Sequence, residues 1–479
     1  MIQYQNFING RFQNASASDR VSVRNPATGA VICEVPDSNA ADVDSAFSAA
    51  AAAQKTWSKL PPIERAAALH KIGASLRQNV SDLARTIVEE QGKTLALAET
   101  EVLFAADYFD YMAEWARRIE GEIIASDRSN ETILLFRQPI GVVAGILPWN
   151  FPLFLIARKA APALVTGNTI VIKPSEETPC NAVKFCQLLQ DLGLPPGIIN
   201  VVHGRGPTTG KMLAASAQAN LVSFTGSVET GSAIMRAAAD NITKVNLELG
   251  GKAPAIVMSD ADIDLAVRAI KASRIINSGQ VCNCAERVYV HKAVADEFSE
   301  KLTAVMKQTH FGDPLVDKSV EYGPLINEKG FNKVQTLVQG AIKEGATVAT
   351  GGNRGALKGG FYFEPTVLIN CRHDMDIIRR EVFGPVVPIV KFDSLEEAIH
   401  FANDSEYGLT SSIYTKDLNT ALKACQEIQF GETYINRENF EAMQGFHAGW
   451  RKSGIGGADG KHGLYEFTQT HVVYLQRYQ

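Results

Sequence analysis

The sequence has few of the features that mark membrane, exported or nucleic-acid-binding proteins. No run reaches the roughly 18 consecutive apolar residues that a spanning helix needs, since the apolar run 140–147 ends at Pro148. The first residues, MIQYQNFINGRF, lack the basic segment and apolar core of an export signal. The 47 basic and 52 acidic side chains give a net charge of −5, which creates no basic field for a polyanion. We therefore expect a cytoplasmic protein with no membrane or nucleic-acid partner.

Cysteine is scarce and odd in number, which excludes a disulfide framework. A C-x-C pair is present, but no second Cys/His cluster with zinc spacing accompanies it, so we expect no metal. The thiols fit a reducing compartment, and each must be judged singly. The seven cysteines are at positions 33, 180, 186, 282, 284, 371 and 425.

What the chain does have is length and an alternating pattern. Its 479 residues, 46% of them apolar, suffice for about three domains or two large ones. Residues 40–118 have helical periodicity, and 122–138 reads as a protruding hairpin around the turn DRSN. From 140 to 258, short β-branched runs alternate with helical ones, and a second alternating region begins at 253. This predicts a doubly wound α/β fold with a second α/β domain.

Three residues could carry nucleophilic chemistry. Cys282 follows a helical stretch and a Gly-Gln pair, where a substrate could approach a thiolate, although a buried structural thiol is the better interpretation of a single cysteine. Glu248 ends a strand in apolar surroundings that would raise its pKa and suit a general base; the alternative is a solvated strand end. Asn150 lies in a strand-to-helix turn, where an amide can donate to an oxyanion or simply shape the turn.

Phosphate-binding signals follow three of the predicted strands. GRGPTTG contains Gly206, and FTGSVETG places Gly226 and Ser227 between a strand and a helix, where free amides bind anions. Lys173 and Glu176 lie just beyond the strand in IVIKPSE, at the sheet edge where open α/β sheets bind ligands. Glu176 could accept from ribose hydroxyls and would repel a 2′-phosphate.

Seven segments, in their order and across nearly the whole chain, resemble the aldehyde dehydrogenase superfamily. They are ILPWNFP, IVIKPSE, FTGSVETG, LELGGKAP, NSGQVCNCAERV, REVFGPV and KSGIGG. The resemblance implies that Cys282 is the nucleophile, that Glu248 is the general base, and that Asn150 with the Cys282 N–H forms the oxyanion hole. It also implies NAD as cofactor. The residues assigned to NAD are Trp149, Lys173, Ser175, Glu176, Gly206, Gly226, Ser227, Glu381 and Phe383, with Lys333 either joining them or lying on a solvated helix face.

The resemblance further implies a division of the chain. Residues 1–118 and 139–250 would form the NAD-binding domain, 251–460 the catalytic domain, and 119–138 with 461–479 a small β element bridging subunits of a dimer or tetramer. The reaction would pass through a thiohemiacetal and a thioester, and Glu248 would activate the water that releases the acid.

Departures from the family pattern point to a polar substrate. FHAGWRKSG replaces the usual PFGG-containing loop, so His447 stands where an aromatic is usual, and Arg158, Asn283 and Glu441 add further polar groups. We expect these four to line the substrate tunnel, the alternative being that they pair with one another. The segment resembles members that oxidise L-lactaldehyde and glycolaldehyde. There are three alternatives. One is oxidation of succinic semialdehyde, whose distal carboxylate Arg158 would suit. The others are ester hydrolysis and a non-catalytic structural or binding role.

Overall fold

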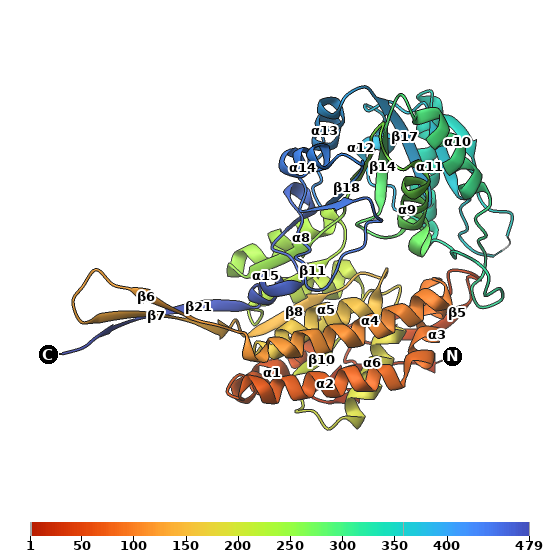
Figure 1. Ribbon diagram of the computed structural model, residues 1–479. Helices are drawn as coiled ribbons and strands as arrows, with labels where there is room; N and C mark the ends of the chain where they lie inside the picture. Colours follow the sequence, from red (N-terminus) through yellow and green to blue (C-terminus); the bar gives the residue numbers. More distant parts are fainter. Residues whose placement is uncertain (1, 358, 479) are drawn as a thin grey trace.

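The computed structural model describes residues 2–357 and 359–478, which form two sheet-centred lobes and a protruding arm (Figure 1). In the first lobe the strand order is β20-β12-β11-β8-β9-β10-β2-β3, and its five central strands run parallel. These are β8 (Val142–Ile146), β9 (Thr169–Lys173), β10 (Ile199–Val201), β11 (Leu221–Thr225) and β12 (Lys244–Glu248). The antiparallel edges are β2 (Asn6–Ile8), β3 (Arg11–Gln13) and β20 (Gly454–Ile455).

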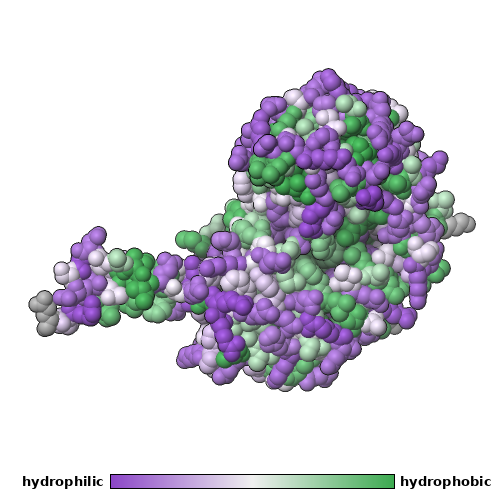
Figure 2. Space-filling view, viewed as in Figure 1, coloured by the Kyte–Doolittle hydropathy of each residue, from purple (hydrophilic) through white to green (hydrophobic). Residues whose placement is uncertain are grey.

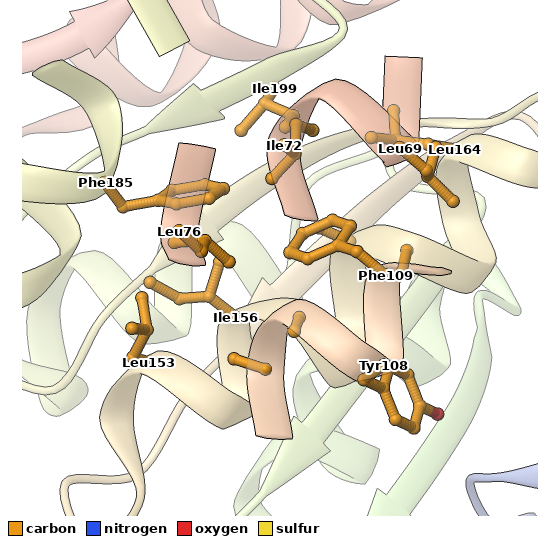
Figure 3. Packing of buried hydrophobic residues seen from close by; sticks show 14 of the residues in the cluster. Leu69, Ile72, Leu76, Tyr108, Phe109, Leu153, Ile156, Leu164, Phe185 and Ile199 are labelled. Atoms are coloured by element: carbon orange, nitrogen blue, oxygen red, sulfur yellow. The ribbon is translucent and has the colours of Figure 1, made fainter. Parts of the chain in front are cut away.

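Helices cover both faces of this sheet, as the alternating pattern predicted. Helix α5 is buried along its whole length because α2 and α4 pack over it; in Figure 3, Ile156 of α5 lies among Leu76 of α2, Phe109 of α4 and Phe185 of α6. The helices of this lobe are α1 (Ala40–Trp57), α2 (Pro62–Gln78), α3 (Val80–Gln91), α4 (Leu95–Glu114), α5 (Pro152–Val165), α6 (Cys180–Asp191), α7 (Lys211–Ala214) and α8 (Val228–Ala238).

The second lobe is built in the same way, with strand order β15-β16-β17-β14-β13-β18-β19. All its strands run parallel except the edge strand β15 (Thr347–Thr350). The others are β13 (Ala253–Val257), β14 (Ala285–His291), β16 (Thr366–Ile369), β17 (Val386–Phe392), β18 (Thr410–Tyr414) and β19 (Glu432–Ile435). Its helices are α9 (Ile263–Ile275), α10 (Ala295–Lys307), α11 (Glu328–Lys343), α12 (Asp376–Arg379), α13 (Leu395–Asn403) and α14 (Leu418–Glu427).

The doubly wound α/β class is therefore confirmed, with one difference of detail. Strand β20 lies within the range 251–460 that the sequence assigned to the catalytic domain, yet it pairs with β12 in the sheet of the other lobe. The reason is that Leu247 and Glu248 of β12 leave an open sheet edge that Gly454 and Ile455 complete.

The arm is a three-stranded antiparallel sheet of β6 (Glu122–Ala125), β7 (Glu131–Pro139) and β21 (Thr468–Gln476). It extends away from both lobes (Figure 1), and α15 (Gly460–Tyr465) leads into it. Apolar side chains lie exposed on it, as the green band in Figure 2 shows. They are Ile123, Ile124, Phe136, Val472, Tyr474 and Leu475.

A small three-stranded sheet of β1 (Ile2–Gln3), β5 (Val31–Pro36) and β4 (Arg20–Arg24) completes the described strands. Within residues 2–357 and 359–478, no helix combines the length and apolarity that crossing a bilayer requires.

The strand order of the first lobe determines where a ligand can bind. From β8 the chain proceeds to β9 and β10 on one side, and then returns to β11 and β12 on the other side of β8. The loops that follow β8 and β11 therefore diverge and leave a crevice at the carboxyl edge of the sheet.

Candidate active site

One cavity receives residues from both lobes. Asn150 follows β8, and Thr225 and Glu248 end the neighbouring strands β11 and β12. Cys282, from the loop before β14 in the second lobe, and His447, from the loop after β19, complete it. The three candidates for nucleophilic chemistry, Cys282, Glu248 and Asn150, thus lie around one space.

Asn150 is held rigidly in the loop between β8 and α5. Its side-chain amide donates to the carbonyl of Gln280 at 3.0 Å, in the segment that carries the thiol. Its own backbone carbonyl accepts from Lys93 Nζ at 2.7 Å and from Asn277 Nδ2 at 3.0 Å. Because an amide nitrogen has two hydrogens, one remains for a ligand in the cavity.

The loop before Cys282 has an unusual backbone. Asn277, Ser278 and Gly279 have φ values of 48°, 61° and 75°, a left-handed conformation that is costly for the first two. Gln280 stabilises it by donating to the Asn277 carbonyl and accepting from the Ile326 N–H. The turn presents Cys282 to the cavity with its side chain partly exposed, whereas Cys284 is buried.

Glu248 is buried, with its carboxylate split between two environments. Oε2 accepts from Lys159 Nζ at 2.9 Å and from Thr225 Oγ1 at 2.6 Å, while Oε1 has no hydrogen-bond partner. The expectation that burial would raise its pKa is wrong. Burial does oppose ionisation, but the charges of Lys159, Arg158 and His447 outweigh it and lower the pKa to about 2. Glu248 is therefore ionised, with one oxygen free.

The four polar residues assigned to the substrate all line this cavity, and they are also paired. Arg158 binds Asp459 with two nitrogens and reaches Glu441 Oε1 at 3.2 Å. Asn283 Nδ2 donates to the other oxygen of Glu441. The alternative weighed from the sequence, pairing with one another, thus holds for Arg158, Asn283 and Glu441, and the assignment of the four residues to the substrate stays a prediction.

His447 has its own partner outside the cavity. Its Nδ1 lies 2.6 Å from Glu432 Oε1, and Tyr434 donates its hydroxyl to the other oxygen of Glu432. Burial lowers the pKa of the ring, but the hydrogen bond with Glu432 and the charges of Glu432 and Glu441 outweigh burial. The pKa is raised well above its usual value, so the ring is an imidazolium.

Arg158, Asn283, Glu441 and His447, here called the polar wall, make up only part of the lining, which corrects the expectation of a polar tunnel. Much of the rest is apolar and includes several aromatic rings, which the sequence reasoning missed because these rings come from three separate segments. This apolar part consists of Leu97, Phe104, Phe151, Phe154, Leu155, Ile276, Val281 and Phe440.

The residues assigned to the adenosine end of the cofactor meet at one edge of the first sheet. Lys173 Nζ donates to the Gly204 carbonyl at 2.8 Å and to Glu176 Oε2 at 3.2 Å, and Glu176 Oε1 accepts from the Gly206 N–H. Ser175 is buried beside them. Ser227, directly after Gly226, caps the N-terminus of α8 by accepting from the Thr230 N–H at 3.2 Å.

The residues assigned to the nicotinamide end come from both lobes. Trp149 packs edge-on against Phe383, with ring centroids 5.7 Å apart, and Glu381 Oε1 accepts from the Gly251 N–H at 2.9 Å. Lys333 is 3.8 Å from Glu381 on an exposed helix position, so it lies beside this group. This donor and acceptor set fits a dinucleotide. In the described part of the chain, no three His, Cys, Asp or Glu side chains are placed to hold a metal.

Several residues that shape the site gave no sequence signal. Lys93 and Glu101 form a buried pair at 2.6 Å, and Glu101 also accepts from the first N–H groups of α5. Lys159 was hidden within the apolar pattern of α5, and Asp459 lies 301 residues from its partner Arg158. Glu432 likewise acts through a contact that only folding creates.

The sequence pattern of the aldehyde dehydrogenase family matches residues 12–473, and the chain belongs to this family. It is therefore an enzyme that oxidises aldehydes. Lactaldehyde dehydrogenase of Escherichia coli (strain K12) is 59% identical over 99% of both chains. The crystal structure of lactaldehyde dehydrogenase from Escherichia coli superposes with a TM-score of 0.98 at 58% identity, covering 99% of this chain and 100% of that one.

Two further solved structures are similar over nearly the whole chain. A 3,6-anhydro-L-galactose dehydrogenase in complex with NAP has a TM-score of 0.96 at 42% identity, covering 99% of this chain and 100% of that one. Betaine aldehyde dehydrogenase from Staphylococcus aureus in complex with NAD+ has a TM-score of 0.96 at 35% identity, covering 99% and 95%.

The buried pair of Lys93 and Glu101 gives the first prediction. Lys93→Met leaves the Glu101 carboxylate buried without its counter-ion, which should lower the free energy of unfolding by about 3–5 kcal/mol. Urea unfolding followed by circular dichroism measures it. Lys423→Met, which breaks an exposed pair with Glu396, is the control and should have a far smaller effect. Equal effects of the two variants would show that the buried pair is not a structural anchor.

Proposed function

We propose that this enzyme uses NAD to oxidise small hydroxyaldehydes, converting L-lactaldehyde to L-lactate and glycolaldehyde to glycolate. One observation carries the proposal. A single cavity contains a thiol at Cys282, an amide at Asn150, an ionised carboxylate at Glu248 and a wall of hydrogen-bonding side chains.

The thiol and the amide suit the first half of the reaction. The Cys282 sulfur attacks the aldehyde carbon, and the carbonyl oxygen becomes an oxyanion. The second hydrogen of the Asn150 amide and the Cys282 backbone N–H can donate to that oxyanion. Because Asn150 is already fixed by its bond to Gln280, this donor needs little reorganisation when charge develops.

The second half of the reaction falls to Glu248. The chemistry that NAD would supply when bound is acceptance of the hydride from the thiohemiacetal, which would leave the acyl group on Cys282 as a thioester. Water attacking the thioester must lose a proton, and Glu248 Oε1 is an ionised oxygen with no other partner. Its lowered pKa makes it a weak base, so it accepts this proton late, as the attacking water becomes acidic.

The polar wall supports a hydroxylated substrate. Asn283, Glu441 and His447 offer donors and acceptors beside the nucleophile, where the second carbon of a bound aldehyde would lie. Arg158, the residue that a succinic semialdehyde would require, is already neutralised by Asp459 and Glu441. That pairing argues against a distal carboxylate, and the 59% identity to a lactaldehyde dehydrogenase argues in the same direction.

The cofactor groups favour NAD over NADP. The pKa of Glu176 is lowered because Lys173 and the Gly206 N–H outweigh its burial, so the carboxylate is negative. A negative charge at the ribose site repels a 2′-phosphate.

We also propose the domain division and the assembly. Residues 1–118 with 139–250 would bind NAD, 251–460 would supply the nucleophile, and 119–138 with 461–479 would join subunits. The exposed apolar side chains of the arm support a dimer or tetramer. The cytoplasmic location, expected from the missing export signal and consistent with the cysteine usage, stays a prediction.

A substrate panel tests the function directly. With NAD fixed, kcat/KM should be highest for lactaldehyde and glycolaldehyde, and lower by about ten- to hundredfold for propanal, which lacks the hydroxyl. Succinic semialdehyde should be poorer still. If propanal or succinic semialdehyde is the best substrate, the assignment of the polar wall is wrong.

Two variants separate the halves of the reaction. Cys282→Ser should abolish NADH formation, since no thiohemiacetal forms. Glu248→Gln should release about one equivalent of NADH per site in a burst and then turn over at least about a hundredfold more slowly. Rapid-mixing absorbance measures both, with the exposed Glu396→Gln as control. Loss of the burst in Glu248→Gln would assign Glu248 to an earlier step.

The cofactor preference depends on one charge. Glu176→Gln should raise the ratio of kcat/KM for NADP to that for NAD by about tenfold, because the repulsion of the 2′-phosphate is removed. Glu177→Gln is a matched control, since that neighbouring carboxylate accepts from Asn327 instead. An unchanged ratio in Glu176→Gln would remove Glu176 from the ribose site.

A further inference from the structure

A buried carboxylate lies in the middle of the second sheet, at the edge where its strands begin. Glu286 is near the start of the central strand β14, and Lys252 and the loop 380–385 directly precede β13 and β17, the two parallel neighbours of β14. Glu286 is 1% exposed and does not line the cavity that contains Cys282. Any effect of its side chain on the reaction must therefore pass through the segments on either side of it.

Both oxygens of Glu286 have two partners. Oε2 accepts from Lys252 Nζ at 2.7 Å and from the Val382 N–H at 3.0 Å. Oε1 accepts from the Phe383 N–H at 3.0 Å and lies 2.8 Å from Nη1 of Arg274. Two cations thus fix the carboxylate, and the carboxylate in turn binds two successive N–H groups of the loop.

The charge on Glu286 makes it a strong acceptor for those N–H groups. Burial opposes ionisation, but the charges of Arg274 and Lys252 outweigh it and lower the pKa of Glu286 to about 2. Arg274 also donates to the Gly384 carbonyl, so the loop is bonded through its donors and through an acceptor. A buried loop whose backbone groups are all paired in this way has little freedom to shift.

The same loop carries the residues proposed for the nicotinamide end of the cofactor. Glu381 directly precedes the two bonded N–H groups, and its Oε1 accepts from the Gly251 N–H. Phe383 has a φ of 59°, a left-handed conformation that is costly for a bulky residue, so bonds from outside the loop are needed to keep this shape. Its ring packs edge-on against Trp149 of the first lobe.

This loop is also close to the segment that carries the thiol. A Cβ on Gly250 would lie 2.7 Å from Glu381 Oε1, and a Cβ on Gly251 would lie 2.4 Å from the Cys282 carbonyl oxygen. The second approach is to backbone, and only glycine permits it. Since Glu286 is four residues after Cys282, the start of one strand carries both the thiol and the anchor of the loop.

We infer that Glu286 is a positioning residue for the cofactor, which fixes the loop 380–385 so that Glu381 is held where the nicotinamide ribose binds. The inference rests on the proposed function, in which NAD is the cofactor and Glu381 contacts that ribose. The fixed loop also sets the distance between the ribose site and the Cys282 sulfur, and with it the alignment that hydride transfer requires.

The effect of Glu286 should be confined to one end of the cofactor. Lys173 and Glu176, proposed for the adenosine end, belong to the first lobe and bond to each other and to the backbone of the loop after β10. ADP has the groups that would bind there, whereas NAD also has the nicotinamide ribose. Release of the loop 380–385 should therefore weaken the binding of NAD and spare that of ADP.

Calorimetric titration of NAD and of ADP tests the inference without turnover. Glu286→Gln replaces one acceptor oxygen with an amide nitrogen that cannot accept, so one N–H of the loop loses its partner. We expect the Kd for NAD to rise by about tenfold and the Kd for ADP to change by less than about twofold. Equal weakening of the two ligands, or an unchanged Kd for NAD, would overturn the inference.

A double variant covers the case in which Glu286→Gln does not fold. Lys252 and Arg274 are both buried, so loss of one negative charge leaves a cation without its counter-ion. Glu286→Gln combined with Lys252→Met removes one charge of each sign and should show the same selective loss of NAD affinity. An unchanged Kd for NAD in this folded double variant contradicts the inference equally.

Asp260→Asn is the matched control for both variants. Asp260 also accepts from two successive loop N–H groups, those of Lys416 and Asp417, but it lies at the opposite edge of the same sheet, beyond the ends of β13 and β18. Its affinities for NAD and ADP should equal those of the wild type. A selective loss of NAD affinity in Asp260→Asn would show that any loosened loop of this lobe has the effect, and Glu286 would have no special role.

Glu381→Gln separates this inference from the function on which it rests. If the wild type does not bind NAD, or if Glu381→Gln leaves the Kd for NAD unchanged, the proposed cofactor site is wrong and the inference is wrong with it. If Glu381→Gln weakens NAD binding and the Glu286 variants do not, the inference alone is wrong.

Discussion

The active site depends on a lysine and a glutamate that have no exposed side-chain surface. Lys93 bonds at once to the Glu101 carboxylate and to the backbone carbonyl of Asn150, while the other oxygen of Glu101 accepts from the N–H groups of Leu153 and Phe154. A carboxylate at that position also meets the positive end of the α5 dipole. One ion pair therefore fixes both the backbone of Asn150 and the start of the helix that presents Arg158 to the cavity and Lys159 to Glu248.

Rigid placement of α5 explains why Glu248 keeps its charge. A carboxylate at the buried end of β12 would ordinarily take up a proton, and its burial does oppose ionisation. Lys159 belongs to α5, which is buried along its whole length, and its Nζ lies 2.9 Å from Glu248 Oε2. Its positive charge stabilises the ionised carboxylate and so helps to offset the effect of burial on the pKa. The low pKa makes Glu248 a weaker base, but it also keeps the carboxylate ionised at every pH near neutrality.

The sequence predicted features that depend on neighbouring residues, and it did not predict contacts between residues far apart in the chain. Strand ends, helix starts and glycine-rich turns are local patterns, so the α/β class, the hairpin 122–138 and the positions of Cys282, Glu248 and Asn150 relative to their strands were accessible from the sequence. The partners were not: Asp459 lies 301 residues from Arg158, and Glu432 reaches His447 across a loop. The error over the pKa of Glu248 has the same origin, because nothing in the sequence indicates that Lys159, 89 residues away, contacts Glu248.

Pairing within the polar wall also limits how strongly the enzyme can discriminate. A site built to hydrogen-bond a hydroxyl rejects an analogue lacking it most strongly when the analogue leaves buried groups unpaired. Here Arg158, Asn283 and Glu441 already satisfy one another, so an apolar aldehyde strands few of them. Because Glu432 holds Nδ1 of His447, the N–H at Nε2 is the main donor left over. Under the proposed function, selectivity for a hydroxylated substrate therefore depends chiefly on whether the substrate can pair with this one donor.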